Sequence, residues 1–305
     1  MELNMLPVTG FYDRMLLNIH SHHWKFTEDS IFKRRMIKLK FALSWCFQNI
    51  FTLFGTHIEM PYLEMMVTQR CNLRCRGCSN LMPLFKHPKD MPIQPLLDDF
   101  EKILQSVDKV HLLKILGGEP FLYKDLPRLI EAAAHSSKVV TIELVTNGLM
   151  IPSEEILKSM RHPKITVIIS DYSRIVSDKM EEVFATLHRH NIQYQFPPLE
   201  AWKDFGGFEA RNREKSQNRA MFQACSTCVT FIGGEIFCCP RAGNGAALGL
   251  VPKIAGEYVE VRNQNISAIQ KDLIAFSKLK VISTCDYCDN PGPEIPVAEQ
   301  ITERA

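Results

Sequence analysis

The sequence predicts an α/β protein whose parallel sheet or barrel carries a metal-dependent site. Short apolar runs without polar alternation, such as 110–116 and 139–146, are typical of strands that are covered on both faces. Segments of helical periodicity separate these runs, and strands joined by helices pair in parallel. Most of the cysteines stand in close groups, which is how metal ligands are arranged.

Composition narrows the class of protein. The chain has 305 residues, 46% of them hydrophobic, with 36 Lys plus Arg against 34 Asp plus Glu. A formal net charge of +2 gives no global field that would attract nucleic acid, so no nucleic-acid partner is expected. There is no apolar run of about 18 residues and no secretory signal, so a cytoplasmic protein is expected. In that reducing compartment the ten cysteines favour metal over disulfides.

The N-terminal segment, 1–58, is expected to be helical. Apolar residues at helical spacing run from 30 to 54, with basic residues crowded into the first half. One interpretation is a helix that packs its apolar side on the main domain. The other is a peripheral membrane or partner contact through 31–54.

Strands and helices then alternate through the core, 59–224. Strands are expected at 62–69, 110–116, 139–146, 165–170 and 192–196. Helices are expected at 96–107, 125–136, after Ser153 and at 177–191. Beyond Pro197 the segment is expected to be irregular, with charges at 203–219 that are either solvated or meet an anionic substrate. A small module, 225–305, follows, with a cysteine-rich hairpin at 229–239 and a helix near 265–279.

Three cysteines after the first strand give the strongest chemical signal. Cys71, Cys75 and Cys78 are spaced by four and three residues in a loop. Three thiolates at this spacing can converge on an iron–sulfur cluster and leave one iron without a protein ligand, which makes that iron a binding site. A zinc knuckle is the alternative, but structural zinc wants four protein ligands and no fourth lies close by in sequence.

Polar sets follow three of the later strands, at the rim where parallel sheets bind ligands. Two glycines let a backbone approach a ligand closely, and a carboxylate beside them can accept from an ammonium group. The alternative is that these sets are ordinary turns and helix caps. The sets are Gly117-Gly118-Glu119-Pro120, Thr146-Asn147-Gly148 and Ser170-Asp171.

The C-x3-C-x2-C loop, followed by the GGEP set, resembles the signature of the radical S-adenosylmethionine (SAM) superfamily over about residues 62 to 290. The resemblance implies a partial (β/α)6 TIM-like barrel with a 4Fe-4S cluster on the three cysteines. It also implies that SAM binds the open iron and yields a 5′-deoxyadenosyl radical. Within this resemblance, Gly118 and Glu119 hold the amino group of SAM, and Ser170 and Asp171 face its ribose with Asn147 nearby.

One position departs from that pattern. Many members of the superfamily carry an aromatic residue just before the third cysteine, where it packs on the adenine of SAM. This chain has Gly77 there. The adenine contact is therefore expected from Phe85 or from a later strand.

The tail resembles the SPASM/twitch extension, which binds an auxiliary 4Fe-4S cluster. Six cysteines are available for four ligand positions, and zinc is the alternative metal. The expected ligands are Cys225, Cys238, Cys285 and Cys288, with Cys228 and Cys239 as substitutes. A spare thiol such as Cys239 is a candidate to return a hydrogen atom to a substrate radical, and the alternative is a buried packing residue.

The resemblance implies a radical SAM enzyme that oxidises or epimerises a small-molecule or carbohydrate substrate. It also implies a low-potential electron donor such as flavodoxin or ferredoxin. A peptide-modifying enzyme acting on a precursor peptide is the alternative, disfavoured because the first 60 residues show no strand hairpin. A hypothesis of another class is a zinc-stabilised binding protein without catalysis.

Overall fold

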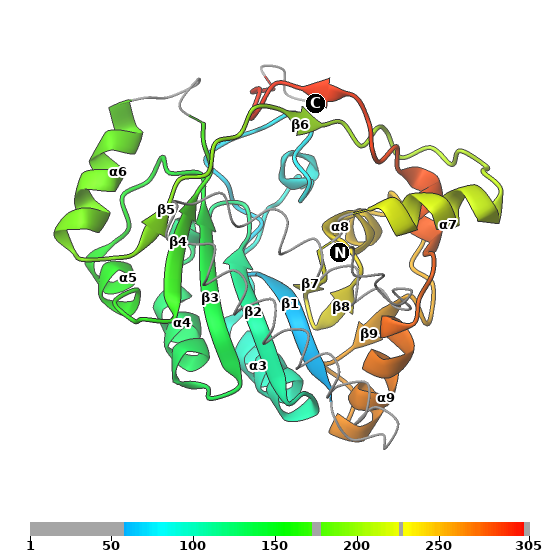
Figure 1. Ribbon diagram of the computed structural model, residues 1–305, viewed down its shortest axis with the longest axis horizontal. Helices are drawn as coiled ribbons and strands as arrows, with labels where there is room; N and C mark the ends of the chain where they lie inside the picture. Colours follow the sequence, from blue (N-terminus) through cyan, green and yellow to red (C-terminus); the bar gives the residue numbers. More distant parts are fainter. Residues whose placement is uncertain (1–57, 173–177, 226–227, 302–305) are drawn as a thin grey trace, which may run out of the picture.

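The computed structural model describes residues 58–172, 178–225 and 228–301. The predicted N-terminal segment, including the helix at 30–54 and the contact surface at 31–54, lies outside the described residues. Within them, eight strands form one sheet in the order β5-β4-β3-β2-β1-β7-β8-β9 (Figure 1). The prediction of an α/β fold with a mostly parallel sheet, as in a partial TIM-like barrel, is confirmed.

The first five strands run parallel to their neighbours and follow one another across the sheet. Their bounds are β1 (Glu59–Met66), β2 (Lys109–Leu116), β3 (Val139–Thr146), β4 (Ile165–Ile169) and β5 (Tyr194–Gln195). Almost all of β1 is buried, as expected for a strand covered on both faces. The sheet therefore places the carboxyl ends of β1 to β4 side by side, and the predicted polar sets follow those ends.

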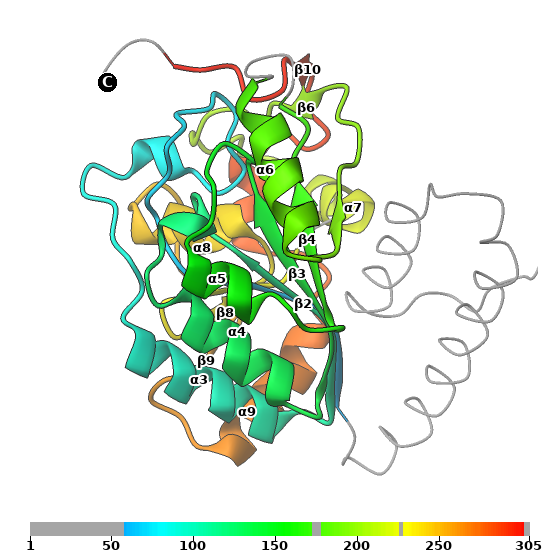
Figure 2. The ribbon, with the colours of Figure 1, turned by 90° about the vertical axis from the view of Figure 1, so that its left-hand side faces the viewer.

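The helices between these strands lie close to their predicted positions. They are α3 (Ile93–Ser106), α4 (Leu126–His135), α5 (Glu154–Ser159) and α6 (Asp178–Arg189). Ser153 caps α5 as predicted, since its hydroxyl accepts from the Ile156 amide at 3.4 Å. Figure 2 shows α3, α4 and α5 along one face of the sheet, which leaves the other face and the strand ends for the site.

The cysteine-rich hairpin continues the main sheet. It consists of β7 (Thr230–Ile232) and β8 (Glu235–Phe237), and β9 (Tyr258–Glu260) pairs with β8. β7 lies parallel to β1, and the Thr230 hydroxyl donates to the Glu64 carboxylate at 3.0 Å. The sixth parallel strand is thus β7 at the β1 edge, so the hairpin shares a sheet with the core. The division at residue 224 stays a prediction.

Several elements beyond Pro197 were not expected from the sequence. The expectation of an irregular segment is wrong for α7 (Lys215–Ala224), which a Glu214–Gln217 capping box starts. A short antiparallel pair, β6 (Trp202–Lys203) and β10 (Glu294–Ile295), crosses the end of the sheet at which the parallel strands finish (Figure 1). The remaining helices are α8 (Pro240–Ala247) and the predicted α9 (Ile266–Ser277).

No helix among the described residues combines the length and the apolar character needed to cross a membrane.

One ion pair joins the edge of the sheet to the first core helix. The Arg262 guanidinium, just after β9, donates to the Asp99 carboxylate on α3 at 2.6 and 3.1 Å. The Asp99 side chain is 3% exposed, whereas that of Arg262 is 42% exposed. Removing the arginine therefore leaves a buried carboxylate without its cation.

We predict that Arg262→Met lowers the free energy of unfolding by about 1–3 kcal/mol. Arg128→Met is the matched control, because its pair with Asp125 is about half exposed and should contribute about 0.5 kcal/mol or less. Urea unfolding of the metal-free chain measures both. An equal loss in the two variants would contradict this role of Asp99.

Candidate functional site

The loop after β1 carries the first cysteine group into a cavity. Cys71, Cys75 and Cys78 all line this cavity, and all three are free thiols. Burial, together with the neighbouring thiols, raises the pKa of Cys71 to about 12 and that of Cys75 to about 11. The three side chains therefore form one electrostatically coupled group of neutral thiols when no metal is bound.

The C-terminal segment holds this loop in place, and no local sequence pattern predicts that contact. The Arg76 amide donates to the Glu299 carbonyl at 2.7 Å, and the Ile301 amide donates to the Arg74 carbonyl at 2.8 Å. Between them, Gln300 pairs with Cys75, and its side-chain amide donates to Cys75 Sγ at 3.2 Å. That bond favours the thiolate and opposes the effect of burial on the pKa of Cys75.

The same segment explains Gly77, the position where an aromatic residue is common in the superfamily. Gly77 has a φ of +69°, a left-handed conformation that favours glycine. A Cβ there would overlap Cδ1 of Ile295 on β10. Phe85, the suggested adenine contact, packs against the core and does not line the cavity. Tyr172 and Trp202 do line it, with ring centroids 5.9 Å apart at an interplanar angle of 73°.

The two glycines at the end of β2 are required by packing within the chain. The Gly118 amide donates to the Thr68 carbonyl at 2.8 Å, and the Glu119 amide donates to the Arg70 carbonyl at 2.8 Å. A Cβ on Gly118 would overlap the Arg70 carbonyl, and one on Gly117 would lie 2.5 Å from the Thr68 carbonyl oxygen. Only glycine therefore lets the cysteine loop lie directly on the end of β2.

Glu119 joins neighbouring strand ends. Its carboxylate accepts from the Asn147 amide at 2.9 Å, the Thr146 hydroxyl at 2.9 Å and the Phe121 amide at 3.1 Å. The side chain is fully buried, and burial raises the pKa of Glu119 to about 7 against the lowering effect of these donors. Glu119 and Pro120 lie behind the cavity wall, which Gly117 and Gly118 form. A contact of Glu119 with SAM stays a prediction.

Some residues of the polar sets after β3 and β4 line the cavity, and others do not. The Asn147 side chain donates to Asn72 Oδ1 at 2.6 Å and lies 3.9 Å from Cys71 Sγ, so it ties β3 to the cysteine loop. Asn147 and Ser170 line the cavity, whereas Asp171 does not. Their roles toward a cofactor stay predictions.

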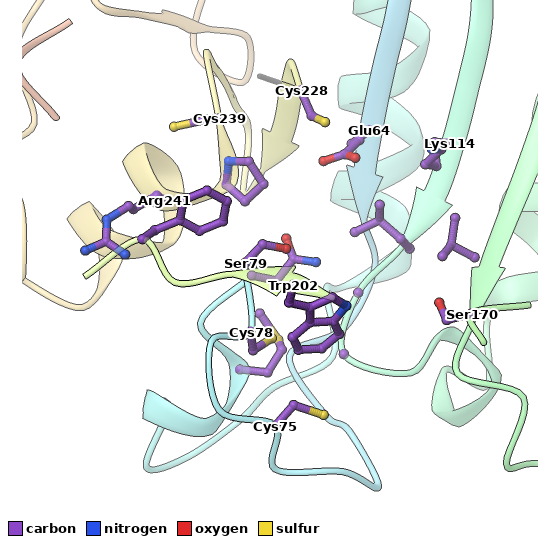
Figure 3. Close-up of a pocket in the computed structure, with 18 of the residues that line it drawn as sticks. Glu64, Cys75, Cys78, Ser79, Lys114, Ser170, Trp202, Cys228, Cys239 and Arg241 are labelled. Atoms are coloured by element: carbon purple, nitrogen blue, oxygen red, sulfur yellow. The ribbon is translucent and has the colours of Figure 1, made fainter. Parts of the chain in front are cut away.

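The second cysteine group faces the same cavity from the other side (Figure 3). Five of its six thiols line the cavity, and the exception is Cys238, which is fully buried in the core. The five are Cys225, Cys228, Cys239, Cys285 and Cys288. Within the described residues, no three His, Cys, Asp or Glu side chains already stand in a geometry that holds a metal ion.

A network of arginines fixes the Cys285–Cys288 loop. Arg213 donates to the carbonyls of Cys285 at 3.3 Å and Cys288 at 2.9 Å, and it pairs with Asp289 at 2.8 Å. Arg211 pairs with the same carboxylate at 2.6 Å. The charges at 203–219 were expected to be solvated or to meet a substrate, and for these two arginines that expectation is wrong. Arg213 and Cys285 are 72 residues apart in the chain, so no local sequence pattern predicts their contact.

The cavity between the two cysteine groups has a volume of about 410 Å³. Four aromatic residues and several aliphatic ones form part of its wall, and the aromatic ones are Tyr172, Trp202, Phe205 and Phe222. Three of its lining residues carry charge, namely Glu64, Lys114 and Arg241. A cavity of this size and mixed character is typical of a site for small molecules.

We predict that Gln300→Ala slows alkylation of Cys75 several-fold at pH 9 in the metal-free chain. The variant loses the donor that favours the thiolate, so the pKa of Cys75 rises further and less of the nucleophilic thiolate is present. Mass spectrometry of the Cys75 peptide across pH measures the shift. Gln105→Ala, on the exposed side of α3, is the control. Identical pH profiles for Gln300→Ala and wild type would contradict the role of Gln300.

Comparison with known proteins identifies the domain that carries this loop. The family model described as the Radical SAM superfamily matches residues 65–181, from β1 into α6. GTP 3′,8-cyclase of Campylobacter jejuni (serotype O:6, strain 81116) is 33% identical over 103 residues, which cover 32% of this chain and 30% of the cyclase. GTP 3′,8-cyclase of Helicobacter pylori (strain 26695) is 29% identical over 127 residues, covering 41% and 38%.

The chain therefore spans about a third of the length of the curated relatives it matches. Among solved structures, BtrN in complex with AdoMet and 2-DOIA matches with a TM-score of 0.45 and 15% identity, covering 81% of this chain and 98% of BtrN. SuiB of Streptococcus suis matches with a TM-score of 0.37 and 19% identity, covering 60% and 47%. These two similarities carry no conclusion about function. The family match contains the cysteine loop and the GGEP set, so residues 65–181 of this chain resemble a radical SAM domain.

Proposed function

We propose that this chain binds a SAM-ligating 4Fe-4S cluster at Cys71, Cys75 and Cys78 and acts on a small molecule held in the cavity. The observation that carries the proposal is that two groups of thiols, far apart in sequence, face one cavity of about 410 Å³. When bound, the cluster and SAM supply a 5′-deoxyadenosyl radical that abstracts hydrogen from the substrate. The radical SAM domain at 65–181 supports the first cluster.

The residues around the first cysteine group fit such a cluster. Three thiols on one loop are the ligand set that leaves one iron open. Glycines at 117 and 118 bring the end of β2 against that loop, so the cavity wall there is backbone rather than side chain. Asn147 and Ser170 add hydrogen-bonding groups on the same wall. This chain has no aromatic side chain at position 77, which is Gly77. Trp202 and Tyr172 offer aromatic surfaces for a purine ring instead.

For the second group we propose an auxiliary 4Fe-4S cluster held by Cys225, Cys239, Cys285 and Cys288. These four thiols line the cavity, and Cys239, Cys288 and Cys285 are the thiols that most strongly raise the pKa of Cys225 after burial. Cys239 takes the place of Cys238 in the set expected from sequence, because Cys238 is fully buried and does not line the cavity. The Arg213 contacts with Cys285 and Cys288 would keep this ligand pair in place.

The cavity favours a small-molecule substrate over a peptide. Trp202 on β6 forms part of its wall, and its volume suits a cofactor and a small polar molecule. The chain's part in the reaction is to hold the substrate beside the first cysteine group and to keep water out. We also propose a flavodoxin or ferredoxin as the electron donor and a carbohydrate as the substrate. The proposed reaction is an oxidation or an epimerisation.

Iron and acid-labile sulfide after anaerobic reconstitution test the two sites. We predict about eight irons per chain in wild type and about four in each quadruple or triple variant that removes one cysteine group. The variants are Cys71/Cys75/Cys78→Ala and Cys225/Cys239/Cys285/Cys288→Ala. The single variant Cys238→Ala is the matched control and should keep about eight irons.

Three outcomes would contradict the assignment. Zinc in place of iron at the second group would make the tail a structural zinc module. A loss of about four irons in Cys238→Ala, with none lost in Cys239→Ala, would restore the ligand set expected from sequence. A colourless chain with zinc at both groups would support the non-catalytic binding protein instead.

A further inference from the structure

Three polar side chains meet on the cavity wall away from the loop of Cys75 and Cys78 (Figure 3). Glu64 comes from the middle of β1, Lys114 from the adjacent β2, and Cys228 from the segment that leads into β7. Figure 3 shows the Cys228 thiol directed toward the Glu64 carboxylate. We call these three residues the floor subsite. None of them has a part in holding either proposed cluster.

Neutral donors position the Glu64 carboxylate. The Tyr62 hydroxyl donates to Oε1, and the Thr230 hydroxyl donates to Oε2 at 3.0 Å. Both donors are buried, and Glu64 itself is 6% exposed. Two neutral hydroxyls orient a carboxylate without neutralising its charge. The carboxylate therefore lines the cavity in a fixed orientation.

The nearest cation is already shared. Lys114 Nζ lies 3.3 Å from Glu143 Oε2, with side-chain exposures of 15% and 10%, and 5.2 Å from the centre of the Tyr62 ring. Burial lowers the pKa of Lys114, but the Glu143 and Glu64 carboxylates outweigh burial and raise it, so the ammonium group stays charged. Lys114 therefore does not serve Glu64 alone, because its ion pair at 3.3 Å is with Glu143.

Cys228, the third residue of the floor subsite, adds no charge of its own. Burial is the main cause that raises the pKa of the Cys228 thiol, and the adjacent Glu64 carboxylate raises it further. The remaining charged residue of the cavity, Arg241, donates to the carbonyls of Gly206 at 2.8 Å and Tyr287 at 3.0 Å on the side of the second cysteine group. A carboxylate as buried as Glu64 is stabilised when a cation pairs with it.

We propose that the floor subsite binds a protonated amine of the substrate, with Glu64 as its acceptor, so that the substrate is an amino-substituted small molecule. This inference rests on the proposed function, because it takes the cavity as the place of the substrate. The ammonium group can pair with the Glu64 carboxylate and donate to its open side. Binding at the floor directs the rest of the molecule toward the Cys71–Cys78 loop, where the hydrogen is to be abstracted.

Cys228 provides a reporter of the charge preference that needs no knowledge of the substrate. The probes are 2-aminoethyl methanethiosulfonate, which is cationic, and 2-sulfonatoethyl methanethiosulfonate, which is anionic. Each forms a mixed disulfide with the thiolate and releases a sulfinate. The rate of modification at Cys228 is followed by mass spectrometry of its peptide, in both the iron-loaded and the metal-free chain. A change in the reactivity of the thiol affects both probes equally, so their rate ratio reports the local charge.

We expect the cationic probe to modify Cys228 at least ~10-fold faster than the anionic probe in wild type. In Glu64→Gln the ratio should fall to about one to threefold, and in Lys114→Met it should rise several-fold above wild type. Glu131→Gln, on the exposed face of α4, is the matched control and should keep the wild-type ratio. If Glu64→Gln does not fold, as judged by circular dichroism, Lys114→Met carries the test alone.

Four results would overturn the inference. They are equal rates for the two probes in wild type, a ratio that the Glu64 and Lys114 variants leave unchanged, no modification of Cys228 by either probe, and protection of Cys228 by iron loading to the same degree as Cys225. The last result would make Cys228 a metal ligand. A chain that fails to load iron would instead refute the proposed function, and the probe ratio in the metal-free chain would still decide the charge preference.

Discussion

The contact between the cysteine loop and the end of β2 is the constraint on which the site depends. Backbone amides at Gly118 and Glu119 donate to the carbonyls of Thr68 and Arg70, each at 2.8 Å, and side chains at 117 and 118 would prevent this approach. The contact sets where Cys71 enters the cavity. It also brings Glu119 to the end of β3, where its carboxylate joins Thr146 and Asn147. Three consecutive strand ends are thereby held as one rigid wall.

A second constraint brings the tail to that wall. Parallel pairing of β7 with β1 places the cysteines that flank the hairpin beside the barrel interior. The buried bond from Thr230 to Glu64 fixes this pairing and orients the carboxylate at the same time. The segment around Gln300 pairs with the first cysteine loop and holds that loop in place. Three long-range contacts thus bring the two thiol groups to one cavity. They are the pairing of β7 with β1, the bond from Thr230 to Glu64, and the pairing of Gln300 with Cys75.

Sequence patterns predicted what local chemistry determines. The apolar strands, the helix after Ser153, the cysteine loop and the GGEP set follow from periodicity, capping and spacing, and the structure places them close to where they were expected. The sequence did not show that Cys238 points into the core while Cys239 lines the cavity, because adjacent residues of a hairpin differ only in the face they occupy. The Arg213 and Gln300 contacts were equally hidden, since each joins residues far apart in the chain. The helix α7 was missed because its capping box begins with a glutamate in a polar segment.

The central claim is that the first cysteine group cleaves SAM. The most direct test is formation of 5′-deoxyadenosine by the iron-loaded chain under anaerobic reduction with SAM, with Cys71→Ala as the comparison and liquid chromatography–mass spectrometry as the readout. We expect 5′-deoxyadenosine from wild type and none above background from the variant. An iron-loaded wild-type chain that forms no 5′-deoxyadenosine, or a Cys71→Ala variant that forms as much as wild type, would contradict it.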